Sequence, residues 1–331
     1  MRDMRTRGGL ALAIAGTMAL TGASLAVAQD EEPIEVAYMS ASSANTWLGA
    51  SLEAMEEVAA ANNIVLTEFD AQFDASLQTT QIQDAIAADR YDGMIMVALA
   101  GSAVIPDLEA AAEAGMKIVG LNQVIGDDFT TVEPQTPVLS AVVFEPPFVR
   151  GERLGALALA ACEGLDPCDV VYFYGVRGLP LDVAVRQGFD AATEGSTVNV
   201  VAEGEGLYLG PDNGLAQMQD ILVSTPDFDV VIGADQPIQG VELALEDAGK
   251  AGQAKLIGFG GSSVAVDAVK EGRWFGELFG VPATEGRLAM EALVEALNGN
   301  DLGGIDPALT VPDEGLILAE NADKFTAEWD G

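Results

Sequence analysis

The sequence predicts an α/β fold of two Rossmann-like lobes, each built on a parallel sheet. The first observation is that Asp229–Gly261 has the pattern of one complete strand-helix-strand unit. Within it, the apolar run Val230–Gly233 suits a strand covered on both faces, Gly249 ends the helix, and Lys255–Phe259 forms the next strand. The second is that Tyr91–Gln123 repeats this order. The third is the length of 331 residues, which suits two domains with substantial cores.

Polar and glycine residues follow the strands of the later unit. Asp235 and Gln236 come after Ala234 at the end of its first strand, and Gly260 and Gly261 come after its second. Ligands of open α/β sheets bind just beyond the carboxyl ends of the strands. We therefore expect a ligand site at Asp235, Gln236 and the glycine turn.

Residues 1–28 have the pattern of an export signal. Arg2, Arg5 and Arg7 precede the apolar stretch Leu10–Val27, and small residues end at Ala28, where we expect cleavage. An uncleaved membrane anchor is the alternative, which the glycine and threonine residues within the stretch weaken. A lipoprotein signal would need an acylated cysteine where Ala23 stands, so we expect a free periplasmic protein without a lipid anchor.

The composition narrows the classes of function. With 15 basic residues, 52 acidic residues and no histidine, the net charge is −37, which argues against nucleic acids, anionic membranes and anionic solutes as partners. The absence of histidine excludes the usual Ser-His or Cys-His nucleophile and any imidazole metal ligand. The Gly258–Ser263 turn lacks the third glycine of a dinucleotide-binding motif. We expect neither catalysis nor a metal or other cofactor.

Several motifs resemble one known family, the periplasmic sugar-binding proteins of ABC importers of the ribose- and galactose-binding type (type I periplasmic binding proteins). The resemblance extends over Ile34–Phe325. It is carried by YDGMIMVA at 91–98, AAAEAGMKIVGLNQ at 110–123, RQGF at 186–189, VVIGAD at 230–235, LEDAGK at 245–250, LIGFGG at 256–261 and AENADKF at 319–325. It implies a solute receptor that closes over one ligand, acts as a monomer, and delivers the solute to a membrane permease with its ATPase subunits.

The resemblance also implies how the chain divides. We expect residues 34–138 plus 281–308 to form the N-terminal lobe and residues 139–280 plus 309–325 to form the C-terminal lobe, joined by a hinge of three connecting strands.

Ligand contacts carry over by resemblance onto the first loops. Asn45 and Trp47 match family positions that present an amide and an aromatic ring to the sugar, although Trp47 as a core residue is the alternative. Phe73 or Gln72 falls near the rim of the cleft. Asn122 and Gln123 stand where the family has an Asp-Arg pair, so they would hold hydroxyl groups without charge assistance; ordinary turn chemistry is the alternative for Asn122.

In the second lobe the resemblance implies Asp182, Arg186 and Tyr208 as ligand contacts. The family often places an arginine on the corresponding helix, as Arg186 is here, and keeps a stacking aromatic near Tyr208. A surface ion pair of Asp182 and Arg186 at a spacing of i, i+4 is the alternative.

Three departures from the family pattern bear on the solute. Ala234, Gly260 and Gly280 stand where family members carry polar side chains that contact sugar. We therefore expect a roomier, less charged cleft that suits a neutral polyol, a larger glycoside or a partly apolar solute. A receptor for a sensor or signalling pathway is the alternative function. The effector domain of a transcription factor shares the fold, but the export signal argues against it.

The chain has two cysteines, Cys162 and Cys168, which flank a predicted helix-to-strand turn. In an exported protein this arrangement favours a disulfide with a local effect, with two free thiols as the alternative.

Overall fold

The computed structural model describes residues 32–331, of which Pro33–Gly331 form one compact unit. The predicted export signal and cleavage position, residues 1–28, lie outside the described residues. Within the part that is described, no helix combines the length and the apolar character needed to cross a bilayer.

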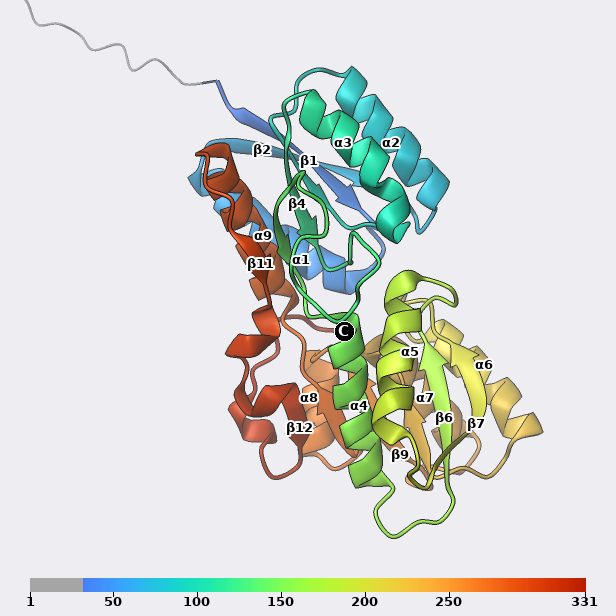
Figure 1. Cartoon of the computed structure of the whole chain (residues 1–331). Helices are drawn as coiled ribbons and strands as arrows, with labels where there is room; N and C mark the ends of the chain where they lie inside the picture. The colour runs from blue at the N-terminus through green and yellow to red at the C-terminus, as the bar shows by residue number, and fades with distance from the viewer. Residues whose placement is uncertain (1–31) are drawn as a thin grey trace, which may run out of the picture. The chain divides into compact units, whose positions relative to one another are not determined.

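The N-terminal lobe is a parallel sheet between two layers of helices (Figure 1). Helices α1 and α9 pack in one hydrophobic cluster on one face, and α2 and α3 pack in another on the opposite face. The six strands, in spatial order, are β11 (Gly303–Ile305), β5 (Leu139–Val143), β4 (Lys117–Leu121), β3 (Gly93–Met96), β1 (Ile34–Ser40) and β2 (Ile64–Asp70). The helices are α1 (Thr46–Ala61), α2 (Ala75–Ala87), α3 (Ile105–Glu113) and α9 (Pro282–Leu297).

The C-terminal lobe repeats this architecture. Its six strands, in order, are β12 (Leu316–Leu318), β10 (Gly276–Leu278), β9 (Lys255–Phe259), β8 (Val230–Ile232), β6 (Cys168–Tyr174) and β7 (Val198–Glu205). Only β12 runs antiparallel to its neighbour. Helices α4 (Pro147–Ala161) and α5 (Pro180–Thr193) cover one face, and α6 (Asp212–Ser224), α7 (Asp235–Asp247) and α8 (Ser263–Lys270) cover the other. Short 3-10 helices lie at Gly101–Val104, Pro307–Thr310, Pro312–Gly315 and Ala322–Lys324.

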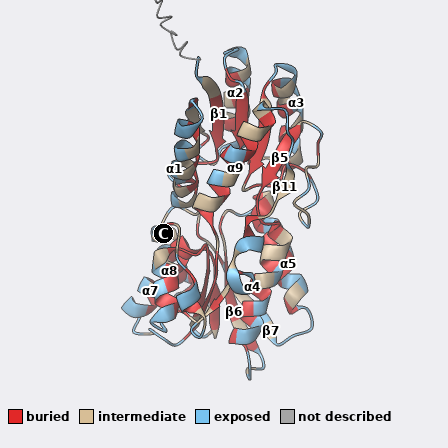
Figure 2. Ribbon diagram, turned by 90° about the vertical axis from the view of Figure 1, so that its left-hand side faces the viewer, coloured by how far each residue is buried: buried red, intermediate tan, exposed pale blue. Residues whose placement is uncertain are grey.

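Buried strands separated by amphipathic helices explain this arrangement. Figure 2 shows that the central strands are mostly buried and that the outer faces of the helices are exposed, whereas the edge strands β2 and β7 are only partly buried. Strands β3, β5 and β8 are buried at every residue, as parallel strands with helices on both faces must be. The two-lobed α/β fold predicted from the strand-helix alternation is confirmed.

The chain passes between the sheets three times within residues 32–331, at 144–146, 279–281 and 306–315. The first passage comes later than the expected boundary at residue 139. Strand Leu139–Val143 pairs in parallel with β4, so it belongs to the N-terminal sheet. All five of its residues are buried there, which its apolar sequence favours.

Helices α4 and α5 approach closely because glycines face the partner backbone. A Cβ atom at Gly188, the glycine of the RQGF motif, would lie 2.0 Å from the carbonyl oxygen of Phe148, and one at Gly151 would lie 2.0 Å from that of Val185. These glycines therefore set the distance between the two helices that cover this face of the sheet.

The predicted disulfide between Cys162 and Cys168 is confirmed. It joins the end of α4 to the start of β6, so its constraint is local.

Gly188→Ala is expected to lower the free energy of unfolding by about 1–3 kcal/mol, because the added methyl group forces α4 and α5 apart. Gly49→Ala is the control, since a Cβ there meets no atom within 4 Å and the position lies within α1. Alanine at Gly49 is expected to be neutral or to stabilise by up to about 1 kcal/mol. Urea unfolding of both variants measures the difference, and equal midpoints would show that the glycine contact does not set the helix spacing.

Candidate functional site

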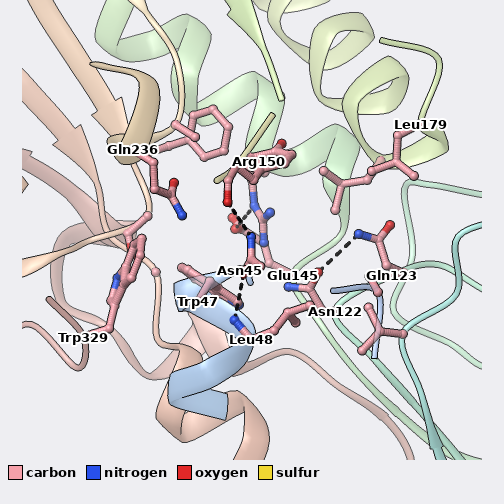
Figure 3. Close-up of a pocket in the computed structure, with 18 of the residues that line it drawn as sticks. Asn45, Trp47, Leu48, Asn122, Gln123, Glu145, Arg150, Leu179, Gln236 and Trp329 are labelled. Carbon is pink, nitrogen blue, oxygen red and sulfur yellow. Dashed lines mark hydrogen bonds and ion pairs between the residues drawn. The ribbon is translucent and has the colours of Figure 1, made fainter. Parts of the chain in front are cut away.

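A cavity lies where the carboxyl ends of the two sheets face each other. Its empty volume is about 720 Å³, part of it open to solvent. Side chains from both lobes converge on it, as Figure 3 shows for Leu48 and Asn122 of one lobe and Gln236 and Trp329 of the other. The wall consists of Ala41, Asn45, Trp47, Leu48, Phe73, Val97, Asn122, Gln123, Glu145, Arg150, Leu179, Leu181, Tyr208, Ala234, Gln236, Phe259, Gly260, Leu278, Phe279, Gly280 and Trp329.

Asn45 links the two lobes at the edge of this cavity. Its Oδ1 accepts a hydrogen bond from the backbone N–H of Leu48 at 2.8 Å, which caps helix α1. Its Nδ2 donates to the backbone carbonyl of Tyr208 in the other lobe at 3.1 Å. The amide thus fixes the start of α1 and holds a contact that depends on how close the lobes are.

Trp47 and Asn122 share a buried partner that the sequence analysis missed. Glu285, in the first turn of α9, accepts hydrogen bonds through Oε2 from Trp47 Nε1 at 3.3 Å and from Asn122 Nδ2 at 3.1 Å. Asn122 has a φ of 63°, a left-handed backbone conformation that is typical of a turn residue. It also lines the cavity, so it is both a turn residue and part of the wall. Glu285 orients both side chains from behind the wall.

The charged groups on the wall, Glu145 and Arg150, form an ion pair. Glu145 lies in the first passage between the lobes and Arg150 at the start of α4, and the Arg150 Nε lies 2.9 Å from Glu145 Oε2. Glu145 also pairs with Arg153 at 2.5 Å. The sequence carries a signal for this cluster that was not recognised: Glu145 comes two residues after a buried strand, at the kind of strand end where ligands bind.

Gly260 and Gly280 stand where the family pattern has polar side chains, and indole rings fill the space beside both glycines. A Cβ at Gly280 would lie 2.2 Å from the Trp47 ring, and a Cβ at Gly260 would lie 2.9 Å from the Trp329 ring. The expectation of a roomier cleft is therefore wrong at these two positions. The glycines make space for aromatic surface.

Other predicted side chains lie where expected. Phe73, Gln123, Tyr208 and Gln236 line the cavity, and Gln123 Nε2 donates to Asn122 Oδ1 at 3.3 Å. Contact of these residues with a ligand stays a prediction.

Arg186 is placed away from the cavity. It lies on α5 and pairs with Asp190 at 2.7 Å and with Glu203 at 2.5 Å, and its guanidinium stacks over the Tyr172 ring. Carboxylates on two neighbouring elements attract the guanidinium more strongly than an open cleft would. The prediction of a ligand contact at Arg186 is wrong.

Asp182 acts behind the wall rather than on it. The side chain is 3 % exposed and accepts hydrogen bonds from the backbone N–H groups of Gly175 and Val176 and from the hydroxyl of Tyr208 at 2.7 Å. Burial raises the pKa of Asp182, and these donors oppose the rise. Asp182 therefore positions Tyr208, which is the residue that faces the cavity.

Asp235 is likewise behind the wall, because the turn after β9 covers it. Its Oδ2 accepts from the Ser262 N–H at 2.7 Å, and Glu277 Oε1 accepts from the Gly261 N–H at 2.8 Å. Both carboxyl groups are fully buried. Burial raises the pKa of Asp235 to about 6 and that of Glu277 well above its usual range. Asp235 supports the glycine turn rather than contacting the cavity.

No group of three or more His, Cys, Asp or Glu side chains within residues 32–331 is arranged to hold a metal ion.

Comparison with known proteins agrees with this architecture. A search of curated proteins finds the ribose import binding protein RbsB of Bacillus subtilis, 25 % identical over 231 residues that make up 70 % of this chain and 70 % of that protein. Among solved structures, an ABC transporter solute binding protein from Mycobacterium smegmatis with bound glycerol has a TM-score of 0.76 at 22 % identity, covering 90 % of this chain and 99 % of that one.

The myo-inositol binding protein of Caulobacter, bound to myo-inositol, has a TM-score of 0.75 at 19 % identity, covering 89 % of this chain and 96 % of that one. At these identities the solved structures show a shared fold. The model of the periplasmic binding protein domain matches residues 36–301, more than half of the 331 residues. The chain therefore belongs to the periplasmic binding protein family.

Proposed function

We propose that this protein is an exported solute-binding protein of an ABC importer and that it binds a neutral sugar or sugar alcohol between its lobes. The observation that carries the proposal is the cavity at the carboxyl ends of both sheets, whose wall is shared by the two lobes. The family match and the import function in the name of the Bacillus subtilis relative support it.

The chemistry of the wall favours an uncharged solute. Asn45, Asn122, Gln123 and Gln236 offer neutral donors and acceptors that suit hydroxyl groups. The charge of Arg150 is already matched by Glu145, so an anionic solute would have to compete with a carboxylate at 2.9 Å.

Closure over the solute follows from the shared wall. A ligand that contacts both lobes binds the closed form better than an open one and shifts the population towards it. The three passages between the sheets permit bending of the lobes about a hinge. Polar groups of both lobes then contact the same ligand. A permease with ATPase subunits recognises the closed form. We place the protein in the periplasm as a monomer that carries no enzymatic activity.

A second candidate is a receptor that passes a signal to a sensor and binds a partly apolar solute. The leucines on the wall favour it: Leu48 from α1, Leu179 and Leu181 at the start of α5, and Leu278 from β10. The identity of the solute distinguishes the two candidates.

Thermal unfolding of the protein beginning at Gln29 tests the function. The panel contains L-arabinose, D-allose, myo-inositol, glycerol and cyclohexanol. A ligand at a hundredfold excess over its Kd adds about 2.7 kcal/mol of stability, and we expect this from a sugar or sugar alcohol. A response to cyclohexanol alone would favour the receptor for an apolar solute, and no response to any carbohydrate would contradict the importer assignment.

Trp47→Ala is expected to weaken the binding of any carbohydrate that stabilises the protein by about 1–3 kcal/mol, because the indole buries apolar solute surface. Isothermal titration measures the change. The control Val223→Ala removes a side chain that is 86 % exposed on α6 and is expected to leave the affinity unchanged. Equal Kd values for Trp47→Ala and the wild-type protein would remove Trp47 from the site.

Glu285 predicts a pH dependence of stability. Burial raises its pKa from 4.5 to about 7, against the opposing field of Arg150. At a pH between these two pKa values, the carboxyl group has lost its proton in the unfolded protein but keeps it in the folded protein. The free energy of unfolding therefore falls as the pH rises from the unfolded to the folded pKa, by on the order of 3 kcal/mol.

Glu285→Gln is therefore expected to lose less stability than the wild-type protein between pH 5 and pH 8, as measured by urea unfolding. Glu291→Gln, exposed on the same helix, is the matched control and should follow the wild-type curve. The titration of Asp235 is present in all three proteins, so the comparison isolates Glu285. Parallel curves for Glu285→Gln and the wild-type protein would contradict the assignment.

A further inference from the structure

The segment Phe325–Gly331, which follows the last strand, reaches the cavity. Trp329 within it is 7 % exposed and forms part of the cavity wall (Figure 3). Its Nε1 donates to the carbonyl of Gly260 at 2.8 Å, and its ring meets that of Trp47 edge to face, with centroids 5.6 Å apart. The indole of Trp47 comes from α1 in the opposite lobe, so the two rings form one aromatic corner.

The segment is attached to both lobes. On the C-terminal lobe, the Ser263 N–H donates to the Trp329 carbonyl at 2.9 Å. On the N-terminal lobe, Glu328 accepts from the backbone N–H of Thr284 at 2.9 Å and from its hydroxyl at 2.5 Å, in the first turn of α9. These bonds restrict the position of the Trp329 ring, which lowers the entropy cost of a ring contact.

The turn that carries the Trp329 contact is itself rigid. Asp235 and Glu277 bind the N–H groups of Ser262 and Gly261 from behind, and Gly260 has a φ of 143°, a conformation open to glycine. A side chain at residue 260 would collide with the Trp329 ring. The wall at this point therefore presents an indole edge and face and no polar side chain.

We propose that Trp329 is a solute-contacting residue which, with Trp47, selects cyclic solutes that present a continuous C–H face. The inference rests on the proposed function and deepens it by naming the substrate class. Aromatic rings cover C–H groups without requiring hydrogen-bond partners, and the amides of Asn45, Asn122 and Gln236 take the hydroxyl groups at the solute's edge. An open-chain polyol has no such face and gains little from the corner.

The test compares Trp329→Ala, Trp329→Phe and the control Asp330→Asn by isothermal titration with L-arabinose, myo-inositol, cyclohexanol and glycerol. Asp330 is exposed next to Trp329, and only its backbone carbonyl makes a recorded contact, with the Ser263 hydroxyl. Trp329→Ala is expected to weaken the cyclic probe that binds best about 10- to 100-fold, with Trp329→Phe intermediate, while the affinity for glycerol changes less than about threefold.

Unchanged affinity of Trp329→Ala for the cyclic probe would overturn the inference while leaving the importer assignment in place. An equal loss for glycerol and the cyclic probe would also overturn it, because the effect would then be on the fold of the cavity. Selective loss for cyclohexanol in a protein that binds no carbohydrate would support the role of Trp329 and contradict the importer assignment. A wild-type protein that binds glycerol but no cyclic probe would overturn the inference alone, and one that binds none of the four probes would overturn both.

Discussion

Three passages of the chain between two sheets are the constraint on which the rest of the structure depends. They hold the carboxyl ends of both sheets towards one cavity, so the loops that follow the parallel strands, except that after β11, contribute to the same wall. Two of these passages also supply functional groups, since Glu145 lies in the first and Gly280 in the second. A change in lobe spacing therefore alters the geometry of the whole wall together, including the bond from Asn45 to the Tyr208 carbonyl.

The fold was predictable because its signals are local. Runs of buried β-branched residues, helix-ending glycines and the repeated strand-helix order each depend on a few neighbouring positions. Strand Leu139–Val143 shows the limit, since its own sequence identifies a strand but not the sheet that it joins. Membership in a sheet depends on pairing with other strands, and β5 pairs with β4 before it and with β11, which comes much later in the chain.

The site was predictable where a residue comes soon after a strand or where the family resemblance marks a position, as it does for Asn45, Trp47, Phe73 and Tyr208. Asn122, Gln123 and Gln236 come soon after a strand and lie on the wall, whereas Asp235 is covered by the turn after β9. Glu285 and Trp329 come from a helix start and from the segment after the last strand, and each reaches the cavity only through contacts made in three dimensions. The prediction for Arg186 failed because one of its two carboxylate partners, Glu203, lies on another element and has no fixed spacing from it in the sequence. The other partner, Asp190, lies one helical turn away.

The fit of an indole over a glycine couples positions that are far apart in the chain. A side chain added at residue 260 meets the ring of Trp329, and one added at residue 280 meets the ring of Trp47. Restoring a polar group at either glycine therefore requires a smaller residue at the paired tryptophan. The specificity of such a site therefore changes through pairs of substitutions, each of which is harmful alone. A protein with only one substitution of a pair has neither an intact indole-lined cavity nor an intact carboxylate-lined one, so the effects of the two substitutions are epistatic.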